Sequence, residues 1–146
     1  MYDKPTLVAQ LQVDEGKENF PYVDTTSHIS IGVGRNLTTN GISDDEMMTF
    51  LDNDIAQVET LLDQHLPWWR TVDDVRQLVL MNMTFNMGIG GLLTFVHFLA
   101  AVKAGNWTVA AQQMTASRWA QQVGARATRL EQIILTGTVP SAGVMS

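Results

Sequence analysis

The sequence predicts an α+β protein that is mainly helical. A small lobe with a β-hairpin or three-stranded sheet is joined by one long helix to an all-helical lobe. Three observations lead to this fold class. Residues 17–37 are the one stretch rich in strand-favouring side chains. Residues 43–66 combine a helix-capping motif with a single apolar stripe. From residue 73 onward, apolar residues recur at helical spacing.

The N-terminal part is predicted to form one short helix and then the sheet. Apolar residues three or four apart in residues 6–13 indicate an amphipathic helix. Pro5 suits its first turn and Gly16 is a natural stop. In residues 17–37, β-branched and aromatic residues are punctuated by glycines, which is typical of short antiparallel strands.

A long helix is predicted next. Ser43 and Glu46 form a capping box, in which a hydroxyl at the cap is followed three residues later by a glutamate. Apolar residues at positions 47, 51, 55, 58 and 62 then fall on one stripe. The helix should end at about Leu66, before Pro67.

The remaining chain is predicted to be helical. A central apolar helix should end at the glycines that follow it, and four further helices should come after it. The expected helices are 75–87 (ended by Gly88, Gly90 and Gly91), 92–103 (capped by Gly105), 106–114, 117–122 and 125–135.

We expect one domain over residues 1–146. Its expected parts are a small lobe at about 14–45, an interlobe helix at about 44–66, a helical lobe at about 67–138 packed with the N-terminal helix, and a flexible tail at 139–146.

Composition and charge exclude several kinds of protein. The chain contains no cysteine, which excludes a disulfide scaffold, a thiolate nucleophile and a Cys-ligated metal. The three histidines lack metal-ligand spacing, so we expect no metal and no cofactor. A net charge of −6 argues against general nucleic-acid binding. The charge is uneven, because residues 1–74 carry −10 and residues 75–146 carry +4.

Two carboxylates suggest a reaction centre. Glu15 lies at the end of the first predicted helix, and Asp24 follows nine residues later in the predicted hairpin. A helix end and a hairpin can place two carboxylates across a cleft, as glycoside cleavage requires. The alternative is a pair of solvated surface charges, since the chain holds 15 acidic residues.

The motifs around this pair resemble those of the phage-type lysozymes. That family carries an E-G, x-Y-x-D, T-I-G-x-G-H pattern at the same offsets. The resemblance extends in order over about residues 5–138. The matching segments are Glu15-Gly16, Tyr22-x-Asp24-Thr25, Ser30-Ile31-Gly32-Val33-Gly34, Asp74-Val75-Arg76, Asn82 to Gly88, Ser117-Arg118-Trp119, Ala125 to Arg129, and Thr136-Gly137-Thr138.

The resemblance implies a role for three residues. Glu15 would be the general acid, with a pKa raised by burial or shielding. Asp24 would be ionised and would position or activate the attacking water or stabilise the oxocarbenium charge. Ser30 stands where the family has a threonine that holds this water, so we expect activity to survive in reduced form. Direct attack by water would invert the anomeric carbon; a transglycosylase is the chemical alternative.

Two further expectations follow from positions that match the family. Arg35 replaces a histidine of the family, and we expect it to form an ion pair with Asp54. The alternative is an ordinary surface arginine. Asn86 on the central helix is expected to bind a sugar acetamido group, whereas Asn82 is expected to satisfy backbone groups internally.

The resemblance also places two arginines near the acid. Arg126 and Arg129 share a helix face, because they lie three residues apart. We expect Arg126 near Glu15 and Arg129 near Asp14; the alternative is an ordinary cationic surface. An arginine beside the acid would lower its pKa, so burial would have to outweigh that effect.

These observations predict a peptidoglycan-degrading endolysin that cleaves the β-1,4 bond between N-acetylmuramic acid and N-acetylglucosamine for lysis of a host cell. The alternatives are a virion-associated lysozyme, a lytic transglycosylase and an inactive wall-binding protein on the same fold. We expect no extra domains, which disfavours the virion-associated role.

The expected partner is bacterial peptidoglycan, acted on by a monomer with no nucleic acid. No signal peptide is apparent at the N-terminus, and the longest apolar stretch, residues 92–102, is too short to span a bilayer. We therefore expect synthesis in the host cytoplasm, no stable membrane insertion, holin-dependent access and action in the periplasm.

Overall fold

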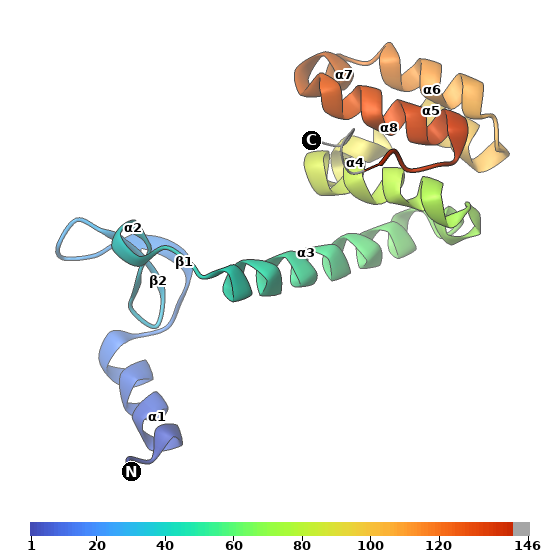
Figure 1. Ribbon diagram of the computed structural model, residues 1–146. Helices are drawn as coiled ribbons and strands as arrows, with labels where there is room; N and C mark the ends of the chain where they lie inside the picture. Colours follow the sequence, from blue (N-terminus) through green and yellow to red (C-terminus); the bar gives the residue numbers. More distant parts are fainter. Residues whose placement is uncertain (142–146) are drawn as a thin grey trace. The chain divides into compact units, whose positions relative to one another are not determined.

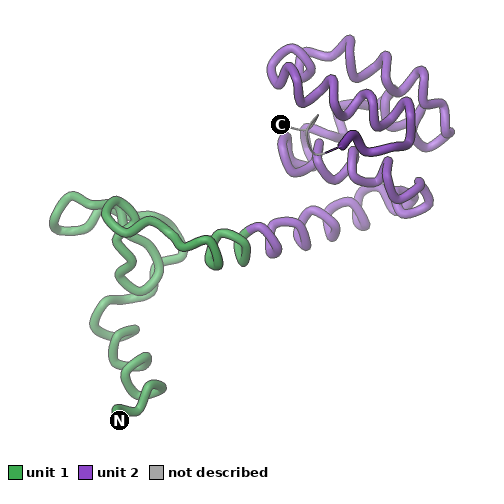
Figure 2. Tube along the Cα trace, in the orientation of Figure 1, with its two compact units in different colours: residues 1–50 green, residues 51–146 purple. Residues whose placement is uncertain are grey.

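The chain divides into two units, residues 1–50 and residues 51–146 (Figure 2). The computed structural model describes residues 1–141, so most of the predicted flexible tail lies outside the described residues. Helix α3 (Asp44–His65) begins in unit 1 and continues into unit 2. The protein is mainly helical with one small antiparallel sheet, which confirms the predicted fold class (Figure 1).

Unit 1 begins with helix α1, Lys4–Glu15, at the position predicted for the first helix. The side chain of Asp3 caps it by accepting a hydrogen bond from the backbone N–H of Thr6 at 3.0 Å. Pro5 lies in the first turn, where a missing N–H costs nothing. Gly16 ends the helix with a φ of 79°. The helix thus ends where the sequence places its stop.

The predicted sheet has three antiparallel strands in the order β1-β2-β3. They are β1 (Glu18–Val23), β2 (Ile29–Gly32) and β3 (Arg35–Asn36). The register pairs Tyr22 with Ser30, and the pairing shifts between residues 18 and 22 of β1. The turn between β1 and β2 therefore starts at residue 24, directly after the strand that leads from α1.

A short helix, α2 (Leu37–Asn40), lies between the sheet and the capping box, where the sequence was not expected to form an element. Asn36 ends β3 and also caps this helix, because its side chain accepts a hydrogen bond from the N–H of Thr39 at 2.9 Å. An asparagine before four residues without proline or glycine is the sequence signal for it.

The long helix α3 begins with the predicted capping box. The hydroxyl of Ser43 accepts from the N–H of Glu46 at 3.2 Å, and the carboxylate of Glu46 accepts from the N–H of Ser43 at 2.7 Å. The helix ends at His65, one residue before the predicted end, and its apolar stripe buries Val58 and Leu62.

Unit 2 holds the apolar core. Helix α8 packs against α4, α6 and α7, and α5 packs against α6 (Figure 1). Every buried apolar side chain of residues 1–141 lies between Val58 and Ile134. The remaining elements are η1 (Trp69–Thr71), α4 (Asp74–Leu93), α5 (Val96–Ala104), α6 (Trp107–Thr115), α7 (Arg118–Val123) and α8 (Ala125–Thr136).

Gly88 interrupts the central helix where the sequence predicted its end, with φ 77° and ψ 163°. The prediction missed the helical turns that resume after this glycine and reach Leu93. The expected helix from residue 92 therefore starts later, at Val96. Leu92 is fully buried, and this packing holds a glycine-containing turn helical.

No single helix within residues 1–141 has the length and apolar character needed to cross a membrane. Helices α4 and α5 would meet that requirement only as a pair, with a bend of 109° between them.

Candidate active site

The three predicted catalytic residues all lie in unit 1, at the ends of the β1–β2 pair. Glu15 is the last residue of α1, three residues before β1 begins. Its carboxylate lies over Gly34, which follows β2: a Cβ added to that glycine would meet Oε2 of Glu15 at 2.9 Å. The φ of Gly34 is +70°, which glycine adopts without strain, and a side chain at this position would push against the carboxylate of Glu15.

Asp24 starts the turn between β1 and β2, and its side chain organises that turn. Oδ1 accepts hydrogen bonds from the N–H of Thr26 at 2.8 Å and from the N–H of His28 at 3.0 Å. The backbone carbonyl of Asp24 also accepts from the N–H of Ser27 at 3.0 Å. An aspartate that bonds the backbone two residues on is a common way to close a turn. The carboxylate is therefore held by the same turn that links the strands.

Ser30 contacts the other oxygen of Asp24. Its hydroxyl donates to Oδ2 at 3.1 Å, and its side chain is buried, with 2% of its surface exposed. Ser30 pairs with Tyr22 across the sheet, which points it to the same end of the hairpin as Asp24. The structure thus brings Asp24 and Ser30 together, with Glu15 held against Gly34 in the same unit.

Hydrogen bonding keeps Asp24 ionised. The hydroxyl of Thr26, then the N–H of His28, together with the hydroxyl of Ser30, lower the pKa of the carboxyl to about 2. Partial desolvation opposes this effect but is outweighed. A carboxylate that stays ionised at neutral pH can accept a proton from water or stabilise positive charge.

Thr26 and His28 belong to this site, although the sequence analysis did not single them out. The Thr26 hydroxyl donates to Oδ1 of Asp24 at 2.7 Å and also contacts Nδ1 of His28 at 2.7 Å. The sequence signal for Thr26 is the spacing Asp24-x-Thr26, because in a turn a threonine hydroxyl can reach back to an aspartate two residues earlier.

The predicted ion pair of Arg35 with Asp54 is wrong. Arg35 binds Glu46 instead, with Nη2 at 2.6 Å from Oε1 and Nη1 at 3.0 Å from Oε2. The hydrogen bond from Arg35, and after it the N–H of Ser43, lowers the pKa of Glu46 to about 2. Asp54 lies eight residues further along α3, roughly 12 Å away along the helix axis. Glu46 is closer to β3 in sequence and meets the guanidinium with both oxygens.

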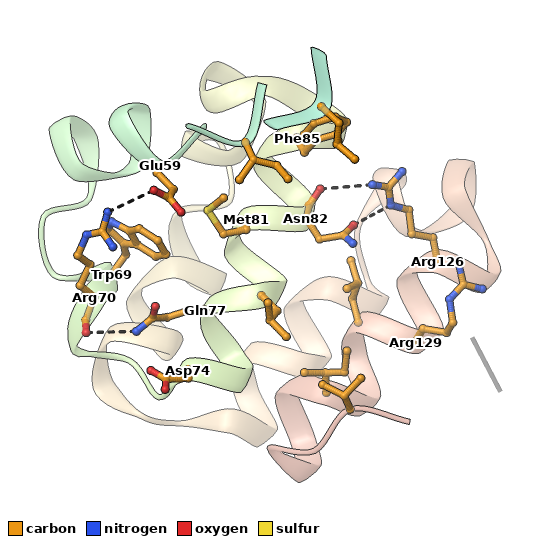
Figure 3. A pocket seen from close by; sticks show the side chains of 16 residues that line it. Glu59, Trp69, Arg70, Asp74, Gln77, Met81, Asn82, Phe85, Arg126 and Arg129 are labelled. Carbon is orange, nitrogen blue, oxygen red and sulfur yellow. Dashed lines mark hydrogen bonds and ion pairs between the residues drawn. The ribbon is translucent and has the colours of Figure 1, made fainter. Parts of the chain in front are cut away.

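Arg126 and Arg129 lie on α8 in unit 2 and line one cavity of about 720 Å³. Figure 3 shows Arg126 beside Asn82, whose Oδ1 accepts from Nε of Arg126 at 2.8 Å. Asn82 therefore bonds a side chain rather than backbone groups, contrary to expectation. Arg126 and Arg129 belong to unit 2, whereas Glu15 and Asp14 belong to unit 1. The predicted contacts between these residues therefore stay predictions. The cavity belongs to unit 2, and its lining contains none of the three catalytic candidates.

Asn86 has a partner that fixes its orientation. The indole N–H of Trp119 donates to Oδ1 of Asn86 at 2.7 Å. Because an indole nitrogen can only donate, the oxygen of the amide must face Trp119. The amide nitrogen then points away from the indole, and Asn86 itself is exposed. Trp119 itself is buried, and its bond to Asn86 was not predicted from the sequence.

The chain belongs to the phage lysozyme family. The family profile matches residues 12–132, which include all three catalytic candidates. Over 95% of its length the chain is 33% identical to the pre-baseplate central spike protein Gp5 of enterobacteria phage T4, of which it spans 29%. It is also 25% identical to a probable T4-type lysozyme 1 of Dictyostelium discoideum, in a match that covers 88% of this chain and 93% of that protein. A second such lysozyme from that organism is 24% identical.

Proposed function

We propose that the protein is a lysozyme that hydrolyses the β-1,4 bond between N-acetylmuramic acid and N-acetylglucosamine in bacterial peptidoglycan. Membership of the phage lysozyme family supports a cell-wall glycoside hydrolase. The observation that carries the proposal is the Asp24–Ser30 hydrogen bond in the same unit as Glu15. By the resemblance to the family pattern, Glu15 would supply the acid, and Asp24 and Ser30 would supply the carboxylate and the hydroxyl that hold the water.

In the proposed reaction, Glu15 gives its proton to the glycosidic oxygen as the bond to the anomeric carbon breaks. The leaving sugar departs as a neutral alcohol. A water molecule held between Oδ2 of Asp24 and the hydroxyl of Ser30 attacks the anomeric carbon, and Asp24 takes the released proton. The pKa of Asp24, lowered to about 2 by its hydrogen bonds, supports an ionised carboxylate at neutral pH.

Inversion at the anomeric carbon is the proposed stereochemical outcome. It follows if water attacks directly, from the face opposite the leaving group, without a covalent intermediate. The anomer formed first can be identified by proton NMR on a soluble fragment, before the sugar equilibrates. A product that retains the original configuration would remove direct water attack from the proposal.

The experiment that tests the activity compares the wild type with Glu15→Gln and Asp24→Asn. Turbidity of chloroform-treated Gram-negative cells should fall with the wild type, and the rate should drop by about 10³-fold or more in Glu15→Gln, since the acid is removed and its shape kept. Equal lysis by the wild type and by Glu15→Gln would contradict the assignment of Glu15 as the acid. Absence of lysis by the wild type would favour a wall-binding protein.

Mass spectrometry of the released muropeptides distinguishes hydrolysis from transglycosylation. Hydrolysis adds one water to each cleaved bond and leaves a reducing N-acetylmuramic acid. A transglycosylase forms a 1,6-anhydro product without that water. We expect the hydrated product, because Asp24 and Ser30 are arranged to hold a water molecule.

Asn86 and the two arginines are proposed to support the reaction. The amide nitrogen of Asn86, directed by Trp119, would donate to the carbonyl of a sugar acetamido group. Arg126, steadied by Asn82, would lie near Glu15, and Arg129 near Asp14. Replacing Arg126 by glutamine should then shift the pH–rate profile, whereas Asn86→Ala should raise KM more than it lowers kcat.

Two biological roles are compatible with this activity. The first is an endolysin that lyses the host at the end of infection, acts as a monomer and reaches the wall through a holin pore. The second is a virion-associated lysozyme, favoured by the likeness to a phage spike protein over 95% of this chain. Mass spectrometry of purified virions decides between them: peptides of this chain in stoichiometric amount support the second role, and their absence supports the first.

A further inference from the structure

The carboxylate of Asp24 is held very differently at its two oxygens. Oδ1 accepts three hydrogen bonds, from the N–H and the hydroxyl of Thr26 and from the N–H of His28, at 2.7 to 3.0 Å. Oδ2 accepts one, from Ser30. A carboxylate oxygen with three donors has no further capacity, whereas Oδ2 can still accept from a water molecule. The two oxygens therefore have separate tasks.

The hydroxyl of Thr26 also determines the proton position on His28. This hydroxyl has one hydrogen, which it donates to Oδ1 of Asp24. Its 2.7 Å contact with Nδ1 of His28 must therefore be a bond that His28 donates. The proton of the imidazole consequently lies on Nδ1, and the donors form one chain from His28 through Thr26 to Asp24.

We propose that Thr26 and His28 are positioning residues for the hydrolysis: they fix Oδ1 of Asp24 so that Oδ2, with Ser30, holds the attacking water. This inference rests on the proposed function and extends it to two residues outside the catalytic trio. Thr26 acts directly on the carboxylate, and His28 acts through Thr26 and through its own N–H. Orientation of this kind matters because a displacement of about 1 Å can cost roughly 10²-fold in rate.

The surroundings of Asp24 support this assignment. Asp24 forms no ion pair with any residue of the described chain, 1–141. The titratable side chain linked to it is the imidazole of His28, which reaches it through the hydroxyl of Thr26. The largest cause of its low pKa is the hydroxyl of Thr26. Removing that hydroxyl should therefore change both the aim of the carboxylate and the pH at which it protonates.

The first test replaces Thr26 by valine, which keeps the shape and the backbone bond but removes the hydroxyl. We expect kcat to fall about tenfold or more with KM within about twofold, and the acidic limb of the pH–rate profile to move to higher pH. Thr26→Ser should restore kcat to within about threefold, because it restores the donor. Thr25→Val is the matched control, since the side chain of Thr25 makes no hydrogen bond within residues 1–141.

The second test uses His28, whose backbone bond is kept by every substitution except proline. His28→Leu removes the ring donor and should lower kcat by about two- to tenfold. His28→Asn offers an amide N–H near the position of Nδ1 and should recover most of that loss. These two variants decide the proposal if Thr26→Val does not fold.

A third measurement does not depend on catalysis. In Glu15→Gln protein with ¹³C-labelled aspartate, NMR titration should show the pKa of Asp24 rising when Thr26 becomes valine, and ¹⁵N shifts should show the His28 proton on Nδ1. If wild-type protein lacks glycosidase activity, the proposed function fails while this titration still tests the hydrogen-bond chain. An unmoved Asp24 titration, or loss of kcat in Thr26→Val that serine does not restore, would overturn the assignment.

Discussion

At the scale of single residues, Gly34 links the backbone to the acid. Its φ of +70° lies in the left-handed region, and Glu15 covers the space where a side chain would go. The atom in the way is a carboxylate oxygen at the end of a flexible side chain, so it would yield. A side chain at position 34 would therefore displace the acid more than it would disturb the fold.

Gly34→Ala and Gly32→Ala form a matched pair for this argument. Both glycines have a φ near +70°, but nothing lies within 4 Å of a Cβ at Gly32. Each substitution should reduce the free energy of unfolding by roughly 1 kcal/mol, from backbone strain alone. Gly34→Ala should in addition lower kcat by about 10²-fold, because Glu15 is displaced. Urea unfolding and muropeptide release measure the two effects. Equal activity losses in the two variants would contradict the contact.

Glu15, Asp24 and Ser30 are assigned to the site from the resemblance of their motifs to the family pattern, and the structure brings Asp24 and Ser30 into contact. Side chains that share one partner could not be predicted in this way. Arg35 was assigned the wrong carboxylate because Glu46 already had a role in the capping box. A carboxylate has room for several donors, so it can cap a helix and bind a guanidinium together. Sequence spacing does not reveal such double use.

At the scale of elements, the Arg35–Glu46 pair ties the sheet to the start of α3. The pKa of Glu46 in the folded state is about 2, below its ordinary value of 4.5. A group with a lowered folded pKa stabilises the fold fully above its unfolded pKa and loses that effect as pH falls through the folded value. The pair should therefore help at neutral pH and cease to help between about pH 4.5 and about pH 2.

Glu46→Gln tests this dependence. Glutamine can keep the capping box but not the charge, so the variant should be less stable than wild type at pH 7. The difference should shrink as pH falls below about 4.5. Thermal unfolding at several pH values measures it. Ser43→Ala is the control: it removes the cap at a cost of about 1 kcal/mol and should show a smaller change with pH. A gap between Glu46→Gln and wild type that stays constant to pH 2 would contradict the pair.

The bond between Trp119 and Asn86 joins α7 to α4. Trp119→Phe keeps most of the packing, including the edge-on contact with Phe95, and removes the indole donor. We expect a loss of about 1 kcal/mol in the free energy of unfolding. If Asn86 binds the acetamido group, KM should also rise, because the amide is no longer held in one orientation. Trp107→Phe is a control, since Trp107 stacks under Arg76 instead. Unchanged stability in Trp119→Phe would refute the bond.

Helix starts and periodic stripes were predictable because their signals are local. Asp3, Ser43, Asn106 and Ser117 all cap helices. Gly88 interrupts the central helix as predicted, but the helical turns that resume after it were missed, and Leu92 in those turns is fully buried. Tertiary packing decided that segment, and packing is not visible in a single window of sequence.

At the scale of the whole molecule, the apolar core is concentrated in unit 2. Unit 1 buries no apolar side chain, and its one buried residue is Ser30. A fragment of residues 43–146 should therefore fold and unfold cooperatively, whereas a fragment of residues 1–50 should stay largely unfolded. Far-UV circular dichroism during heating measures both. Cooperative unfolding of the 1–50 fragment would contradict this distribution of stability.

Most of the net negative charge lies in unit 1, whereas the apolar core lies in unit 2. Residues 1–50 carry eight carboxylates and three basic side chains, a net charge of −5, and residues 51–146 carry −1. The acidic candidate site must approach an anionic wall, so repulsion should slow it at low salt. We expect lysis to accelerate as salt rises from about 10 to about 150 mM, where the Debye length falls from roughly 30 to roughly 8 Å. A short uncharged glycan serves as control. A steady decrease in lysis from very low salt upward would contradict this.

The boundary between the units lies inside α3 rather than in a loop. Each residue of a helix advances the chain by about 1.5 Å and turns it by about 100°. One residue inserted between Val58 and Leu62, the two buried residues of α3, would therefore turn Leu62 by about 100° away from the face that it shares with Val58. The spacing of these two residues is thus fixed by their burial on one side of the helix.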